Sequence, residues 1–101
     1  MSEQQGRVST GPKAPVTGLN DDLEFMGKRL HVQTEHMELP VAHIVTQVFS
    51  NGRVLMSKKR ECPAGIQASQ DIGGVQKLMS AQHYQVLQEI AAKQAKILSS
   101  R

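Results

Sequence analysis

Apolar and polar residues alternate through the middle of the chain. Within residues 29–37, Leu30, Val32 and Thr34 alternate with polar residues, which predicts a half-buried strand. Residues 41–49 (VAHIVTQVF) are rich in β-branched residues and predict the central strand, with Pro40 at its start, where a missing N–H donor is tolerated. Residues 53–61 resume the extended pattern. Their charged end suits an edge strand, because charges there discourage pairing with other chains.

A two-residue turn separates the second and third predicted strands. Asn51 and Gly52 both accept the positive φ angles that a type I′ hairpin turn requires. Residues 63–70 follow the third strand and form a predicted connection, because Pro63 and Gly65 break regular structure. With a regular register, the hairpin pairs Phe49 with Val54, Val48 with Leu55, Gln47 with Met56 and Thr46 with Ser57.

The C-terminal part of the chain changes to helical spacing. From Gly74 to Ser99, neither proline nor glycine interrupts the sequence after the first residue, and Ser69 or Asp71 can cap the helix start. At about 1.5 Å per residue the predicted helix is about 37 Å long, whereas the predicted strands, of about seven to nine residues each, cover about 25 to 30 Å. We therefore expect residues 91–101 to overhang the sheet and to fray, pack on a second copy or dock on another protein. The predicted apolar stripe consists of Val75, Leu78, Met79, Val86, Leu87, Ile90, Ile97 and Leu98.

The N-terminal segment differs in composition from the rest. Residues 1–22 combine Pro, Gly, Ser, Thr and Gln with almost no large apolar side chain, so burial cannot repay the entropy of ordering them. We predict a disordered tail over 1–22, either a solubilising leader or a peptide ligand, and a single domain over 23–101. The predicted fold class is α+β, with a three-stranded antiparallel sheet (β-β-β) followed by one long C-terminal amphipathic helix.

The length of the chain limits its core. A chain of 101 residues permits one domain, small enough that self-association, for example as a homodimer, would add stability. The net charge of +3 decides little, and two phenylalanines and one tyrosine are too few for a base-stacking platform. No apolar run is long enough for a signal peptide core or a membrane span. We therefore expect a cytoplasmic protein that makes no membrane contact.

No pattern of catalytic or metal-binding residues stands out. The four histidines lack the spacing of a zinc site, and no glycine-rich phosphate loop is present. Cys62 has no internal disulfide partner, and a nucleophilic role would need a base and an oxyanion site that the sequence does not indicate. His31 and Glu35 can share one strand face as ordinary polar contacts. We expect no enzyme activity, no metal and no cofactor.

Two groups of residues and the end of the helix are candidates for partner binding. The basic run at residues 58–60 creates a local positive field that can contact phosphate or an acidic protein surface, although such a run is more often a solvated edge. Residues 82–84 (QHY) interrupt the apolar stripe of the helix, which indicates either a contact surface or partial exposure at the rim of the sheet. The predicted partner-binding residues are Lys58, Lys59, Arg60, His83, Tyr84, Ile97 and Leu98.

Three sequence pieces together resemble a known group of proteins. They are residues 31–35 (HVQTE), residues 44–49 (IVTQVF) leading through Gly52 into Lys58 and Lys59, and Leu78-Met79 followed by residues 82–83 (QH). The combination resembles short proteins and modules of myxobacteria, Geobacter-like and predatory bacteria, which pair an HVQTE-type strand with a hairpin and an LMxxQH-type helix. The similarity covers about residues 28–90. Most members have no assigned activity, and the resemblance extends to the RomX-type adaptors.

The resemblance, rather than composition or spacing, suggests a partner. It implies a non-enzymatic adaptor that binds a small Ras-like GTPase and a response-regulator scaffold, as part of a guanine-nucleotide exchange factor complex in cell polarity and motility. Such an adaptor would stabilise the nucleotide-free or GTP-loaded form of the GTPase. The residue pattern leaves one alternative open, a phosphate or nucleic-acid binding module that uses the basic third strand.

Overall fold

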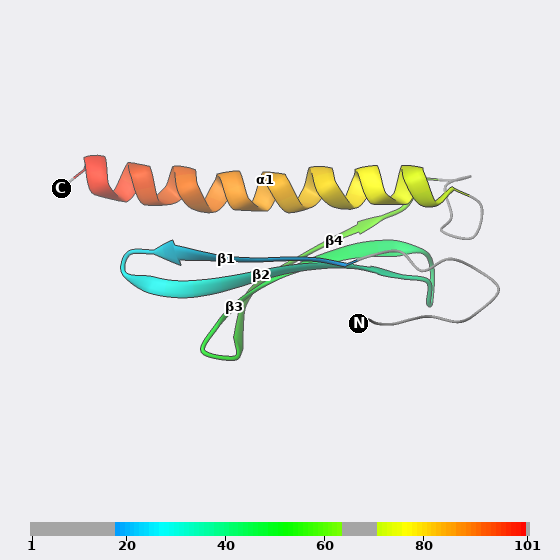
Figure 1. Ribbon diagram of the computed structural model, residues 1–101, viewed down its shortest axis with the longest axis horizontal. Helices are drawn as coiled ribbons and strands as arrows, with labels where there is room; N and C mark the ends of the chain where they lie inside the picture. The colour runs from blue at the N-terminus through cyan, green and yellow to red at the C-terminus, as the bar shows by residue number, and fades with distance from the viewer. Residues whose placement is uncertain (1–17, 64–70, 101) are drawn as a thin grey trace, which may run out of the picture.

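The protein is an α+β fold with one sheet and one long C-terminal helix. The computed structural model describes residues 18–63 and 71–100. Its elements in chain order are β1 (Leu19–Phe25), β2 (Lys28–Met37), β3 (His43–Ser50), β4 (Arg53–Glu61) and α1 (Ile72–Ser99). Figure 1 shows α1 lying along one face of the sheet, which confirms the antiparallel sheet and the C-terminal helix that the sequence predicts.

The sheet has four strands in the order β1-β2-β3-β4, so the prediction of three strands was wrong. The additional strand, β1, begins inside the stretch assigned to the disordered tail, whereas residues 1–17 lie outside the described part of the chain. Leu19, Leu23 and Phe25 form an apolar side of β1, and its register pairs Leu23 with Leu30 of the buried core. Pairing with β2 thus gives this acidic segment the buried contacts that its composition alone did not indicate.

The two outer hairpins both turn through two residues with positive φ. Asn51 and Gly52 have φ angles of 53° and 79°, which agrees with the predicted turn between β3 and β4. Met26 and Gly27 have φ angles of 52° and 83° and join β1 to β2 in the same way. This second turn was not predicted, because methionine at a positive φ angle is uncommon.

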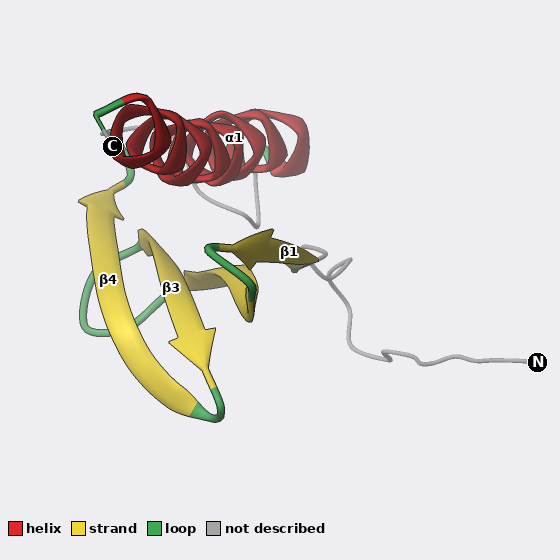
Figure 2. Cartoon of the chain, turned by 90° about the vertical axis from the view of Figure 1, so that its left-hand side faces the viewer, coloured by secondary structure: helices red, strands yellow, loops and turns green. Residues whose placement is uncertain are grey.

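The register of the β3–β4 hairpin departs from the regular pairing at a bulge. Phe49 pairs with Val54 as predicted, but Val48 pairs with Met56, so Leu55 is an extra residue on β4. The predicted pairs of Val48, Gln47 and Thr46 were therefore wrong by one residue. A bulge of this kind bends the edge strand and increases its twist. Figure 2 shows the turn end of this hairpin extending away from α1.

The helix begins two residues before the predicted start and is capped by Asp71. The Asp71 carboxylate accepts a hydrogen bond of 2.8 Å from the Gly74 N–H, which satisfies one of the free donors at the helix start. A Cβ atom on Gly74 would collide with this carboxylate, so a larger residue there would displace the Asp71 side chain from its capping position. The alternative cap, Ser69, lies outside the described residues.

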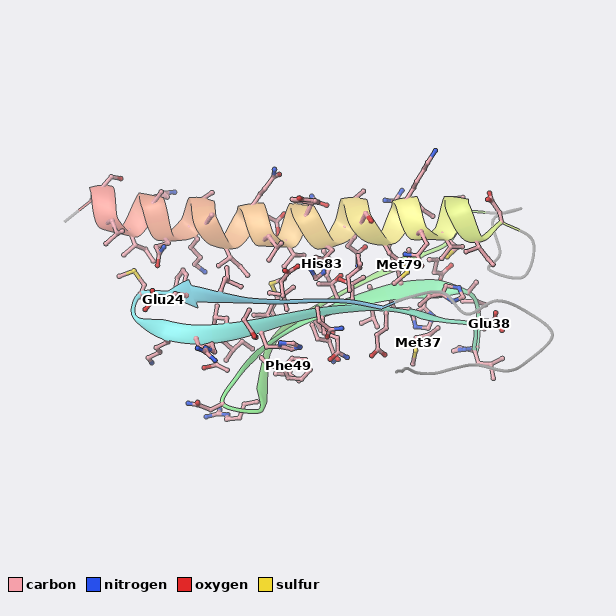
Figure 3. The ribbon with its side chains drawn as sticks, in the orientation of Figure 1. Glu24, Met37, Glu38, Phe49, Met79 and His83 are labelled. Atoms are coloured by element: carbon pink, nitrogen blue, oxygen red, sulfur yellow. The ribbon has the colours of Figure 1, made fainter. Side chains whose placement is uncertain are left out.

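The core between helix and sheet consists of two apolar clusters. One contains Leu30, Val32, Val48 and Val86, and the other contains Ile44, Val75 and Met79. Figure 3 shows Met79 between α1 and the sheet, whereas Phe49 and Met37 lie on the opposite side of the sheet, which we call the open face. No helix of the described chain is long and apolar enough to cross a membrane.

Candidate protein-interaction surface

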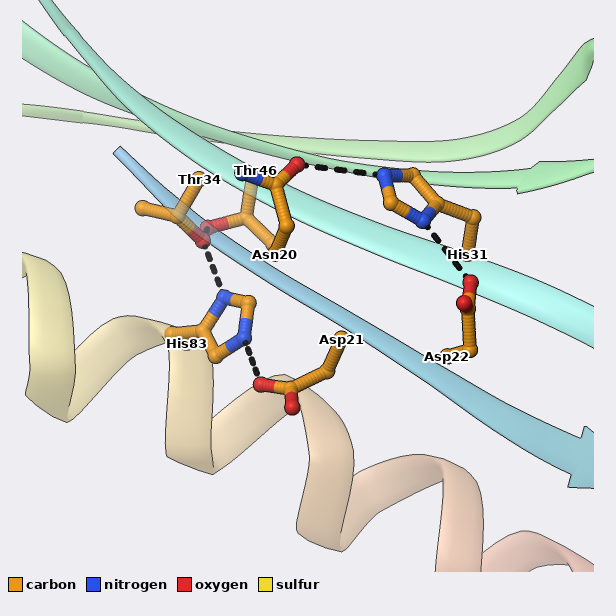
Figure 4. Close-up of polar contacts among 7 residues, drawn as sticks. All are labelled: Asn20, Asp21, Asp22, His31, Thr34, Thr46 and His83. Carbon is orange, nitrogen blue, oxygen red and sulfur yellow. Dashed lines mark hydrogen bonds and ion pairs between the residues drawn. The ribbon is translucent and has the colours of Figure 1, made fainter. Parts of the chain in front are cut away.

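A chain of buried polar side chains separates the two apolar clusters. The Thr34 and Thr46 hydroxyls of β2 and β3 lie 2.7 Å apart, and Thr34 Oγ1 is also 2.7 Å from Nδ1 of His83. The other ring nitrogen of His83 lies 2.8 Å from the Asp21 carboxylate of β1 (Figure 4). Both ring nitrogens of this buried imidazole are therefore hydrogen-bonded, as burial of a polar group requires.

Gln82, the residue before His83, extends the same chain toward β4. Its side-chain amide donates to Thr46 Oγ1 at 3.0 Å and to the Lys58 carbonyl at 3.1 Å. Gln82 and His83 are only 2% and 4% exposed, so the prediction that they are partly exposed at the rim of the sheet was wrong. They instead satisfy the hydroxyls of the sheet, which sets the position of α1 along the strands.

The order carboxylate, imidazole, hydroxyl in Asp21, His83 and Thr34 resembles a catalytic relay. A relay of this type works only if the hydroxyl can reach a substrate. The Thr34 side chain is 0% exposed and shares its hydroxyl with Thr46, so no substrate atom can approach it. In this arrangement the three residues join the helix to two strands rather than activate a nucleophile.

A second histidine links β1 and β2 on the open face. Nδ1 of His31 lies 2.9 Å from the Asp22 carboxylate and Nε2 lies 3.1 Å from the Asn20 side-chain oxygen. The His31 ring also contacts the Phe49 ring of β3 with centroids 6.1 Å apart. Glu35 is bonded to Gln33 rather than to this histidine. His31 therefore connects three strands on a face that α1 leaves uncovered.

The most exposed apolar side chains of the sheet gather where the β3–β4 hairpin turns. Val54 and Leu55 are 50% and 58% exposed, and the half-buried Phe49 pairs with Val54 on the open face. We call these three residues the hairpin end. Because the hairpin extends away from α1 (Figure 2), the helix does not cover Val54 and Leu55, and both remain exposed.

The basic run predicted to bind a partner is divided between the two faces of the sheet. Lys58 pairs with Thr46 under the helix and forms an ion pair of 3.7 Å with Glu89 of α1. Lys59 pairs with Val45 and projects to the open face, while Arg60 projects to the same side as Lys58. Lys59 and Arg60 are exposed. The three residues thus do not form one positive patch.

The remaining predicted partner-binding residues lie on α1 in three different environments. Tyr84 is 66% exposed, whereas His83 is part of the core and does not belong to the surface. Ile97 is half-buried and Leu98 is 53% exposed. The overhang was predicted to begin at residue 91, but the helix still contacts the sheet at Gln94. There the Met26 N–H of the β1–β2 turn donates a hydrogen bond to the Gln94 side chain. The β1–β2 hairpin, which was not predicted, extends the sheet further beneath the helix.

Cys62 is a half-buried free cysteine that follows β4. Partial burial raises the pKa of the Cys62 thiol above its ordinary value, and the nearby Arg60 charge opposes this effect. A thiol of this kind is less reactive than a free one at neutral pH. Within residues 18–63 and 71–100, no cluster of His, Cys, Asp and Glu side chains has the arrangement of a metal site.

The residues of β1 that support the site were not predicted from the sequence. Asn20, Asp21 and Asp22 each bond a histidine, and all three fall in the segment assigned to the tail. A signal was present, because Leu19, Leu23 and Phe25 occupy alternate positions and only Asp21 breaks the period of two. That exception is the residue that bonds the buried His83.

Comparisons of this chain with protein-family models, with curated proteins and with solved structures found no match.

Proposed function

We propose that this chain is a non-enzymatic adaptor that acts in the cytoplasm by binding a protein partner through the hairpin end. The observation that carries the proposal is the exposure of Val54 and Leu55 on a hairpin that projects from the rest of the fold. Such a group loses water contact when a partner covers it, and burial of two aliphatic side chains favours association.

The position of the hairpin end suits an adaptor. Its side chains come from a two-strand ladder closed by a tight turn, so the backbone loses little conformational entropy on binding. Lys59 lies further along the same strand on the open face and adds a positive charge at the rim of the surface. A partner with an apolar centre and acidic rim would match this surface.

The resemblance to the RomX-type adaptors suggests which partner to test. It favours a small Ras-like GTPase together with a response-regulator scaffold, in a complex that promotes guanine-nucleotide exchange and controls bacterial polarity and motility. In that complex the adaptor would stabilise the nucleotide-free or GTP-loaded GTPase without itself performing chemistry.

A binding and exchange experiment tests the proposal. The purified chain is titrated into a Ras-like GTPase from the same cell, with and without the response-regulator protein, and release of a fluorescent guanine nucleotide is followed. We expect binding and faster release with the wild-type chain. We expect Leu55→Asp to weaken binding at least about tenfold, because a buried carboxylate without a partner opposes association.

Val41→Asp is the matched control, because Val41 is also an exposed aliphatic residue, 48% exposed, and precedes β3 at the end opposite the hairpin end. It should bind as the wild type does. Equal binding by Leu55→Asp would show that the hairpin end is not the contact surface. Absence of binding to either protein, with salt-sensitive binding to duplex DNA, would favour the phosphate or nucleic-acid alternative.

A further inference from the structure

The two edges of the sheet carry opposite charges. The β1 edge contains Asp21, Asp22 and Glu24 and no basic residue. The β4 edge contains four basic residues and a single acidic one, Glu61. No strand of the described chain pairs with the outer side of β1 or of β4, and Figure 2 shows these strands at opposite sides of the sheet. The molecule thus presents one acidic and one basic strand edge.

We propose that a second copy of this chain adds its β1 edge to the β4 edge of the first, so that the sheet continues from one molecule to the next. The four strands alternate in direction, so β4 of one copy and β1 of the next are antiparallel when copies repeat in the same orientation. The even number of strands makes this continuation possible without a reversal of the second copy.

One register places unlike charges together on both faces. Val32 and Thr34 are buried beneath α1, and the strand pairings put Asp21 of β1 and Arg60 of β4 on that same face. Asp22 and Lys59 lie on the open face. When Lys59 of one copy is opposite Asp22 of the next, Arg60 is opposite Asp21 and Met56 is opposite Phe25. Both faces therefore gain a pair of opposite charges, and an apolar pair is added at one end.

The β1 edge also has space for the incoming side chain. A hollow of about 220 Å³ lies between β1 and α1 and is lined by Asp21, His83 and Tyr84, among others. In the proposed register, Arg60 of the neighbouring copy projects toward this hollow. There it can pair with the exposed Asp21 carboxylate and lie against the exposed Tyr84 ring, which is favourable for a guanidinium group.

The covered and uncovered parts of each copy are compatible with this arrangement. The helix packs over β1, β2 and β3 and contacts β4 at Lys58, so the outer side of β4 is accessible. In this register Val54 and Leu55 lie past the last residue of β1, next to the Met26 and Gly27 turn of the neighbouring copy. The open face of the hairpin remains available to a partner, and the inference does not depend on the proposed adaptor function.

The same charges oppose symmetric pairing. Two β4 edges would bring basic residues close together, and two β1 edges would bring carboxylates close together. The unlike edges attract, so the contact is head-to-tail and each copy retains one free edge of each sign. An association of this kind forms rings or open chains rather than a closed twofold dimer.

Sedimentation of the purified full chain over a concentration series tests the proposal. The wild-type chain should reach average masses above that of a dimer as its concentration rises, and about 1 M salt should reverse this association. Lys59→Glu and Asp22→Lys should each weaken association at least about tenfold, because each places like charges opposite one another. An equimolar mixture of the two variants should associate again, since every contact between unlike variants pairs opposite charges.

Lys93→Glu, on the exposed side of α1, is the control for the change in net charge and should associate as the wild type does. Asp22→Lys also removes a bond to His31, so Glu24→Lys, opposite Ser57 beside Lys59, provides a second β1 variant with the same expected loss. A monomer at every concentration would overturn the proposal and leave the β4 edge to an acidic strand of another protein. Unchanged association of both β1 variants would also overturn it.

Discussion

At the scale of single residues, His83 is a buried histidine whose two ring nitrogens both need a hydrogen-bond partner. It is the one imidazole that bridges helix and sheet within the buried polar layer, between the Thr34 hydroxyl and the Asp21 carboxylate. Buried polar groups of this kind contribute little net stability when satisfied but cost much when a partner is lost. The layer therefore acts mainly on specificity, because any other position of α1 would leave these groups unpaired.

His83→Leu tests this role. The substitution fills the space but removes both hydrogen bonds, and we expect the free energy of unfolding to fall by about 1 to 3 kcal/mol. Thr34 retains Thr46 as a partner, which limits the loss. Chemical denaturation measures the change. Tyr84→Leu, at the exposed neighbouring position, should change stability by less than about 0.5 kcal/mol, and similar losses for both variants would contradict the assignment.

Cys62 gives a prediction about pH. Because burial raises its pKa despite the Arg60 charge, Cys62 should react with iodoacetamide more slowly than a free thiol at about pH 8. Arg60→Ala should slow the reaction further. Because burial disfavours the thiolate in the folded protein, Cys62 costs no stability below the unfolded-state pKa, and the free energy of unfolding falls as the pH rises from there through the higher folded-state pKa. A rate equal to that of a short unfolded peptide would contradict this.

At the scale of elements, the sequence predicted what periodicity and turn chemistry determine. The bounds of β4 agree with the expected 53–61, and the helix extends over almost the expected range, because these segments have strong local patterns. β1 was missed because Asp21 interrupts its alternation and because Met26 does not indicate a turn. Both features depend on contacts with residues far along the chain, which local patterns do not contain.

The bulge at Leu55 is a second feature that local patterns did not reveal. Residues 53–61 alternate poorly at their start, and no glycine marks the irregularity. The register is instead decided by which side chains lie beneath the helix, where Val48 and Thr46 are buried. The consequence for the candidate surface is direct, because the bulge leaves Leu55 without a cross-strand partner.

Gly52→Val tests the turn that fixes this hairpin. Gly52 has a φ angle of 79°, which a β-branched residue adopts only with strain, so stability should fall by about 1 kcal/mol or more. Thermal unfolding measures the loss. Gly73→Ala is the matched control, because no backbone atom obstructs a Cβ there and alanine favours the helix. An unchanged melting curve for Gly52→Val would rule out the turn assignment.

At the scale of the whole molecule, the end of α1 and the edges of the sheet make separate predictions. A chain that ends after Ala95 keeps the Gln94 contact with the β1–β2 turn and loses the partly exposed Ile97 and Leu98. We expect its free energy of unfolding to fall by less than about 1 kcal/mol. A chain that ends after Lys93 also loses the Gln94 bond and should be less stable.

Self-association should not differ between the full chain and the chain that ends after Ala95, because the strand edges are unchanged. Sedimentation of both forms at the same concentrations checks this. Loss of association in the shorter chain would place the contact between copies at the end of the helix instead. Weaker binding of a partner by the shorter chain, with unchanged association, would assign Ile97 and Leu98 to the partner surface.

The consecutive residues Gln82 and His83 contact the two outermost strands, since Gln82 bonds a carbonyl of β4 and His83 bonds a carboxylate of β1. In mechanical terms, α1 is a tie across the width of the sheet. A force that pulls the two edges apart would act on the ladders between neighbouring strands one after another, so the weakest ladder would open first. The helix provides a parallel path for that force, and tension between the edges is therefore shared by the buried polar layer as well as by the strands.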